Sequence, residues 1–443
     1  MLELELGTYI EKLNYSDLPN PVVHATKRCF LDYMAAVIPG GLEPPALALQ
    51  KALVDDLNHG KASLIPSGIS ATPRSAALIN ATASHTLEVD DIYRNAIYHP
   101  GPPVISAALA ALQSINGSGE DLILGIVAGY EISNRIGAAV QPAHYDYWHT
   151  TGTVGTFGAC VAAAKILGLN AVQCKHALAN AATMAAGLQQ AFRSDAMSKP
   201  LHAGRAAETG VLCAQMAVAG VTGADHMLEG ERGFGNAMSR DVDWQNGFIS
   251  LGTDYTITRM TQKIHCCCGH TFAAIDAVLE LRKRVDLNSR TVKSIQVSSY
   301  RKALEVCGNQ VPRTSFEAKF SLPYVVAVAA IEGRVGLAAF LDETLNDPDI
   351  RSLMEKVEVG VGDEAEAIFP AQRSATVIIE MMDGKKLSHH APTRRGDPDS
   401  PLSDQDIENK FLELTGSILD DAQKQTMIAQ IWALEQQDKP VFY

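Results

Sequence analysis

The sequence has little of what marks a membrane protein, a nucleic-acid binder or a secreted domain. It holds no uncharged apolar run of about 18 residues or more, so we expect no membrane span. The N-terminus, MLELELGTYIEKL, lacks the basic and apolar regions of a signal peptide, which predicts a cytoplasmic protein. Acidic residues outnumber basic ones by 50 to 37, and the net charge of −13 argues against nucleic-acid and membrane partners. A small anionic metabolite stays compatible with a local cationic pocket.

Cysteines and aromatic residues are also scarce. The eight cysteines form no C-x-x-C pair and are too scattered for a disulfide scaffold. Three of them are consecutive at 266–268, and adjacent residues do not converge easily on one ion, so we predict no metal site. No G-x-x-x-x-G-K-[ST] loop occurs, and we expect no cofactor. Aromatic residues make up only 6%, whereas Ala and Gly are abundant, which favours closely packed helices over a β-sandwich.

The patterning predicts a mainly α protein, with a large all-helical domain and a smaller α+β lid domain. GTVGTFG at 152–158 has a small residue at every third position, which is typical of a buried central helix. Beyond residue 265 the residue pattern becomes partly strand-like. A β-hairpin is indicated there by the segment SATVIIEMM, the turn Asp383-Gly384 and the segment KKLSHH. The expected boundaries are a helical domain over 1–265, the lid over 266–402, and C-terminal helices over 403–443 that return to the helical domain.

Polar residues able to carry chemistry gather in four segments near predicted helix starts. Most such groups in proteins are structural, since acidic residues complement helix N-termini and single histidines are usually satisfied within a core. Their co-occurrence favours a functional site. Lys199 precedes Pro200, which predicts that Lys199 lies just ahead of the following helix, where a cation adds to the attraction for anions. The four segments are 85–104, 144–153, 193–207 and 263–276.

These segments resemble the MmgE/PrpD family, which includes 2-methylcitrate dehydratase, cis-aconitate decarboxylase and iminodisuccinate epimerase. The resemblance covers essentially the whole chain. It implies a large α domain with a smaller lid, a homodimer, and cofactor-independent chemistry on a carbon beside a carboxylate of a small anionic metabolite. The motifs that carry it are HTLEVDDIY, HPGPPV, HTTGTVGTFGA, MSKPLHAGRAA, CCGHT, FEAKFSLPYVVA and IENKF.

The resemblance also implies site residues. Lys199 is expected as the base, because burial or nearby cations can depress the pKa of a lysine. The other expected catalytic residues are His149, Tyr145 and Asp91. The expected substrate-binding residues are His99, Arg94, Asp90, Glu88, His270 and Tyr324. Two positions depart from the family pattern: Glu88 replaces the usual Asp, and Ile92 replaces a usual hydroxyl residue.

Those departures shape the expected reaction. A dehydratase must protonate a leaving hydroxyl, so the apolar Ile92 counts against dehydration. We therefore expect an isomerase that epimerises a dicarboxylate such as iminodisuccinate, by removing and returning a proton beside a carboxylate. A 2-methylcitrate-type dehydratase and a cis-aconitate-type decarboxylase are the enzymatic alternatives. A member of the family that only binds a small anion or a protein partner is the third possibility.

Overall fold

The computed structural model describes residues 1–194 and 196–443. It divides into two compact units. The first, called the helical unit below, comprises Met1–Thr86, Asp90–Gln262 and Ser403–Tyr443. The second, called the α+β unit, comprises Leu87–Val89 and Lys263–Leu402. The prediction of a mainly helical protein is confirmed, and in the described part of the chain no helix is both long and apolar enough to cross a membrane.

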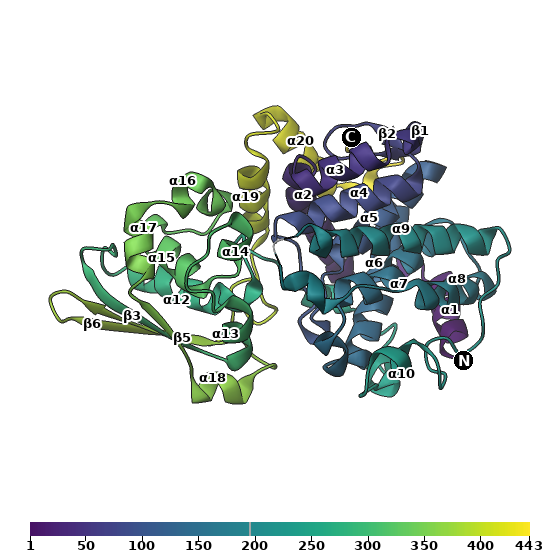
Figure 1. Ribbon diagram of the computed structural model, residues 1–443. Coiled ribbons are helices and arrows are strands. Elements are labelled where there is room, and N and C mark those ends of the chain that lie inside the picture. The colour runs from purple at the N-terminus through teal and green to yellow at the C-terminus, as the bar shows by residue number, and fades with distance from the viewer. Residues whose placement is uncertain (195) are drawn as a thin grey trace. The chain divides into compact units, whose positions relative to one another are not determined.

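The helical unit is built around α4, α5, α6, α7 and α9, which lie side by side in Figure 1. Its long helices are α1 (Leu2–Lys12), α2 (Asn20–Gly40), α3 (Pro44–Ala52), α4 (Pro73–Thr86), α5 (Gly101–Ile115), α6 (Gly119–Val140), α7 (Thr150–Ile166), α8 (Ala171–Met184), α9 (Ser198–Val218), α19 (Asp404–Thr415) and α20 (Asp421–Trp432). Two short helices complete it, α10 (Phe234–Met238) and α11 (Trp244–Phe248).

Helix α7 is the buried central helix that its glycine spacing predicts. Sixteen of its residues, all except Lys165, are buried, and α5, α6, α8 and α9 pack against it. Small residues make this possible, because a Cβ on Gly158 would meet Ser133 Oγ of α6 at 2.8 Å. A side chain at that position would force the helices apart, which is why the Ala/Gly-rich composition suits this packing.

The helical unit is not purely helical, which corrects one expectation. Strands β1 (Leu57–Ser63) and β2 (Ser70–Ala71) pair antiparallel within it. The sequence there shows no apolar alternation, since most of β1 is exposed and its single fully buried side chain is Ala62. Hydrophobic periodicity is the main signal for a strand, so an exposed hairpin of this kind is easily missed.

The α+β unit holds a four-stranded sheet in the order β4-β3-β5-β6. Strands β3 and β4 are parallel, whereas β3–β5 and β5–β6 are antiparallel, and Gly384 at φ 83° lies in the predicted hairpin turn. Figure 1 shows α12 and α15 over one face of the sheet. The strands are β3 (Val292–Ser299), β4 (Val357–Val361), β5 (Ala375–Met381) and β6 (Lys386–Ala391), and the helices are α12 (Phe272–Arg282), α13 (Arg301–Cys307), α14 (Ser315–Lys319), α15 (Leu322–Glu332), α16 (Asp342–Leu345), α17 (Pro348–Met354) and α18 (Asp363–Ile368).

Candidate active site

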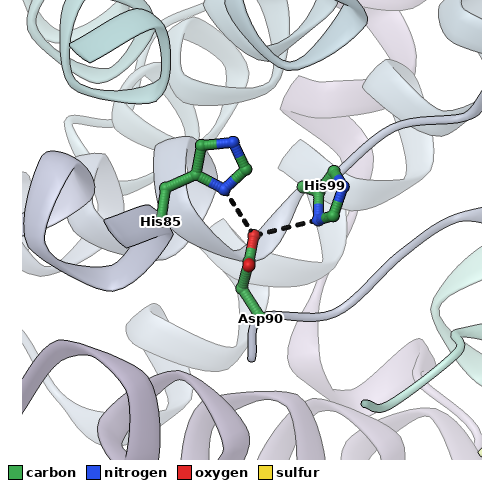
Figure 2. Close-up of side chains that lie close together, drawn as sticks. All are labelled: His85, Asp90 and His99. Carbon is green, nitrogen blue, oxygen red and sulfur yellow. Dashed lines mark hydrogen bonds and ion pairs between the residues drawn. The ribbon is translucent and has the colours of Figure 1, made fainter. Parts of the chain in front are cut away.

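Two imidazoles converge on one buried carboxylate in the helical unit (Figure 2). His85 is the penultimate residue of α4, and its Nδ1 lies 2.7 Å from Oδ2 of Asp90 in the segment that follows. His99, just before α5, places its own Nδ1 3.0 Å from the same oxygen. Asp90 and His85 are buried, and His99 is half-buried. Asp90 is therefore hydrogen bonded to Nδ1 of His85 and lies at ion-pair distance from Nδ1 of His99, so it can orient both rings.

These three side chains are also of the metal-ligand type, and their donor atoms lie within 4.8 Å of one another. Two ligands of a tetrahedral zinc ion, each about 2.1 Å from it, are separated by about 3.4 Å. The separations of 2.7 Å and 3.0 Å are shorter than this ligand spacing. We therefore interpret the three residues as two imidazoles oriented by a carboxylate.

Burial keeps the His85 ring neutral. It lowers the pKa of His85 to about 3, assisted by the charge of Lys199 and opposed by Asp90. A neutral ring whose Nδ1–H donates to Asp90 keeps a lone pair on Nε2, and this nitrogen is buried without a hydrogen-bond partner among the described residues. A buried acceptor of this kind is ready for a donor group of a bound molecule.

His149 extends the cluster from the N-terminus of α7, as the cap residue of that helix. Its ring stacks on His85 with centroids 5.5 Å apart, and it meets the edge of Phe192 at 4.8 Å. Burial, with smaller contributions from neighbouring histidines, holds the pKa of His149 well below its usual value. The ring is thus neutral at neutral pH and able to give or accept a hydrogen bond.

Lys199 supplies positive charge to the same cluster. Its Nζ lies 5.5 Å from the centre of the Phe192 ring, the ring that also contacts His149. The side chain is buried, and its charge contributes to lowering the pKa of His85. One sequence expectation is corrected here, because Lys199 lies inside α9 rather than ahead of it. Pro200 is tolerated since the first N–H groups of a helix have no intrahelical acceptor.

Asp91 faces structural partners. Its carboxylate accepts from the backbone N–H of Gly101 at 2.9 Å and from the hydroxyl of Tyr130 at 2.7 Å. Burial and the nearby charge of Asp32 raise the pKa of Asp91 to about 8. A Cβ on Gly101 would come within 2.7 Å of the carboxylate, so a glycine is needed for this approach. Asp91 thereby joins the segment that carries His99 to the start of α5.

The remaining expected residues divide between the two units. Arg94 (half-buried, in the short 3-10 turn Arg94–Ala96) and Tyr145 (half-buried, in the turn Ala143–Asp146) belong to the helical unit. Glu88, His270 and Tyr324 belong to the α+β unit. The sequence predicts that all ten residues lie in one site. Within the helical unit, the structure brings four of them together around His85: Asp90, His99, His149 and Lys199.

The three residues of the α+β unit each have a buried partner there. Glu88, at φ 61°, receives the ammonium of Lys263 on its carbonyl at 3.0 Å and on its carboxylate at 3.3 Å. His270 is hydrogen bonded through Nδ1 to the hydroxyl of Tyr300 at 2.8 Å, and burial with nearby arginines keeps its pKa well below the usual value. The hydroxyl of Tyr324 donates to the carbonyl of Ala339, and burial raises its pKa.

Two residues of this cluster are not predicted from the sequence. His85 opens the first polar segment but sits at the end of a helix, where a histidine reads as a charge complement to the helix C-terminus. His202 follows Lys199 by three residues, and its Nδ1 lies 2.9 Å from Nδ1 of His149. The helical spacing of Lys199 and His202 puts both on one face of α9, and this is the signal that could have found His202.

Two family models match the chain: the MmgE/PrpD N-terminal domain over residues 4–246 and the MmgE/PrpD C-terminal domain over residues 265–435. Among curated proteins, the chain is 25% identical to the cis-aconitate decarboxylase-like protein oryM of Aspergillus oryzae, over 97% of this chain and 94% of that one. It is 25% identical to the cis-aconitate decarboxylase of Aspergillus terreus (94% and 90% covered) and 28% identical to that of Homo sapiens (91% and 86% covered).

The comparisons overturn the expected reaction. The relatives are decarboxylases, which are lyase-type enzymes, and they contradict the expectation of an epimerase acting on iminodisuccinate. The expected enzyme class, isomerase, is therefore not supported either. The inference from Ile92 fails because an apolar residue in place of a hydroxyl counts only against dehydration. It does not distinguish an epimerase from a decarboxylase, since neither reaction expels a hydroxyl group.

Proposed function

The chain belongs to the MmgE/PrpD family, and from this premise we propose that it is a lyase that decarboxylates a small unsaturated tricarboxylate of the cis-aconitate class. The observation that carries the proposal is the cluster of imidazoles and one lysine around buried Asp90 in the helical unit. Such a cluster offers positive charge, N–H donors and a proton source without a cofactor.

Decarboxylation requires stabilisation of a developing negative charge and delivery of one proton to carbon. When the C–C bond to the departing carboxylate breaks, its electron pair stays on the substrate and spreads through the neighbouring double bond toward a second carboxylate. Positive charge and N–H donors placed beforehand in a desolvated site stabilise that charge strongly. A carbon atom then takes up one proton, so each turnover releases one CO₂ and consumes one proton from the enzyme.

The residues of the helical unit divide these tasks. Lys199, buried beside Phe192, supplies the charge that stabilises the developing carbanion. His99 and Arg94 bind the retained carboxylates, for which an arginine fork is well shaped. His149, at the start of α7, delivers the proton to carbon. Asp90 holds His85 and His99 in one orientation through the two Nδ1 contacts.

The test is incubation of the protein with cis-aconitate in D₂O, with CO₂ release and the product's NMR spectrum followed together. We expect one CO₂ per substrate and one deuterium on one carbon of a five-carbon product. Lys199→Gln is expected to lower kcat by about 10²-fold or more, because it removes the stabilising charge. Lys51→Gln, at an exposed lysine near the end of α3, is the matched control and should leave kcat unchanged.

Two outcomes would contradict the proposal. One is a wild-type protein that binds cis-aconitate but releases no CO₂. The other is a folded Lys199→Gln protein, verified by circular dichroism, with the wild-type kcat, which would remove Lys199 from the assignment. Release of water instead of CO₂ from a hydroxylated tricarboxylate would place the enzyme among the dehydratases of its family.

A further inference from the structure

His149 is hydrogen bonded to a second histidine that the reaction above leaves unused. Nδ1 of His202 lies 2.9 Å from Nδ1 of His149, and the ring centroids are 5.2 Å apart. In such a pair one nitrogen carries the proton and the other accepts it. His149 is buried, whereas His202 is half-buried, so the pair leads from the interior of the helical unit outward.

Two glycines allow the rings to meet. A Cβ on Gly152 of α7 would lie 3.1 Å from Cβ of His202 and 2.5 Å from the carbonyl of Ala186, so any side chain would push α9 away. Gly187 adopts φ 150°, and its carbonyl accepts the backbone N–H of His149 at 2.9 Å. The backbone on both sides of the contact is therefore arranged around the pair.

His202 also lines a cavity of about 500 Å³ in the helical unit. The cavity wall includes Ser198 and Arg205 of α9, and Arg205 exposes 62% of its side chain. Because that wall residue is mostly hydrated, water and small buffer molecules can reach the cavity. His202 is thus the member of the pair that meets solvent.

Decarboxylation requires a fresh proton in every turnover, and the pair of His149 and His202 offers a route for it. Each turnover leaves one proton on the product, so a buried acid must be recharged from solvent before the next one. We propose that His202 is a proton relay that recharges His149 from the cavity. The proposal rests on the proposed function, since a reaction without net proton uptake has no use for a relay.

The transfer balances as follows. A hydronium ion or buffer acid in the cavity gives a proton to Nε2 of His202 and becomes water or the buffer base. His202 passes its Nδ1 proton to Nδ1 of His149, which becomes the imidazolium. His149 then gives its Nε2 proton to the substrate carbanion. Both rings end neutral with their protonated nitrogens exchanged, so each ring turns over before the next transfer. Burial lowers the pKa of both histidines, so neither ring retains the proton for long.

The experiment measures the first turnover and the steady state. In rapid-quench assays with cis-aconitate in dilute buffer, we expect His202→Gln to slow the first turnover as well, because His149 is neutral at rest and receives the proton of every turnover through His202. Steady-state kcat should fall by on the order of tenfold or more, because a glutamine cannot pass the proton on. His202→Ala leaves space for a small molecule, so added imidazole should restore its kcat, while wild-type kcat barely responds.

The matched control is His176→Gln on α8, a histidine whose Nδ1 accepts the backbone N–H of Gly223. It should match wild type in both phases. The relay is overturned if His202→Gln keeps its steady-state kcat, or if added imidazole restores nothing to His202→Ala, which is the pattern of a purely structural residue. A wild-type protein that releases no CO₂ contradicts the proposed function itself, a result distinct from either.

Discussion

At the scale of single residues, burial sets the charge state of the helical unit. It lowers the pKa of His85 to about 3 and that of His144 to about 4, and it raises the pKa of Asp91 to about 8. Acids and imidazoles alike are pushed toward their neutral forms. In the proposed reaction, the positive charge of buried Lys199 then acts on the substrate with few other charged groups nearby.

His144 gives a measurable prediction for stability. It is hydrogen bonded to Thr153 and to the carbonyl of Met238, and its folded-state pKa lies below the ordinary 6.5. As pH falls, the unfolded chain takes up the proton first, so this histidine's stabilising contribution is lost between pH 6.5 and about 4. The difference in unfolding free energy between wild type and His144→Gln should shrink by about 1.4 kcal/mol per pH unit there.

The measurement is urea unfolding of both proteins at several pH values. His59→Gln, at an exposed histidine on β1, is the control for the loss of a histidine outside the core. A pH-independent difference for His144→Gln would mean that the buried ring is protonated in the folded state. Using the difference between two proteins removes the opposite contribution of Asp91, whose raised pKa weakens the fold as pH rises toward 8.

At the scale of elements, the contact between α7 and α9 brings residues of the candidate site together. His149 caps α7, while Lys199 and His202 lie in the first turns of α9. The two helices approach through small residues: a Cβ on Gly210 would lie 2.4 Å from both Ala159 Cβ and the backbone nitrogen of Cys160. Backbone cannot move aside as a side chain can, so this contact sets the spacing of the helices.

Gly210→Ala should therefore destabilise the protein. Alanine improves helix propensity by about 0.5–1 kcal/mol, but forcing two helices apart costs about 1–3 kcal/mol or more, and the clash dominates. We expect a lower midpoint in thermal unfolding and a reduced kcat. Gly360→Ala in β4, where an added Cβ meets nothing within 4 Å, is the control and should change neither. An unchanged midpoint for Gly210→Ala would show that α7 and α9 can separate without cost.

At the scale of the whole molecule, the net charge of −13 opposes an anionic substrate at long range. Salt screens this repulsion, because the Debye length falls from about 30 Å at 0.01 M to about 10 Å at 0.1 M. For a tricarboxylate we therefore expect kcat/KM to rise over that range of NaCl, with kcat at saturation unchanged. A fall in kcat/KM would mean that the local charges of Lys199 and Arg94 govern the encounter.

Residue patterns predicted much of the fold and part of the site. Composition and glycine spacing were sufficient to predict the buried helix α7. The Asp383-Gly384 turn was sufficient to predict the hairpin of β5 and β6. Spacing also drew attention to His99, His149 and Lys199. The exposed strands β1 and β2 escaped prediction because nothing apolar alternates in them. The proposed reaction rests on the relatives, because the motifs are too similar across the family to distinguish one unsaturated or hydroxylated substrate from another.

The sequence by itself determined the mainly helical character, the family, and the residue types available for chemistry, because periodicity and motif spacing are local properties of the chain. Only the tertiary structure decided which groups act as partners. It placed His85 and His99 on one oxygen of Asp90, paired His149 with His202 across 53 residues, and kept Glu88 with Lys263 in the α+β unit. These pairings, and the desolvation that neutralises the rings, arise when distant segments pack together.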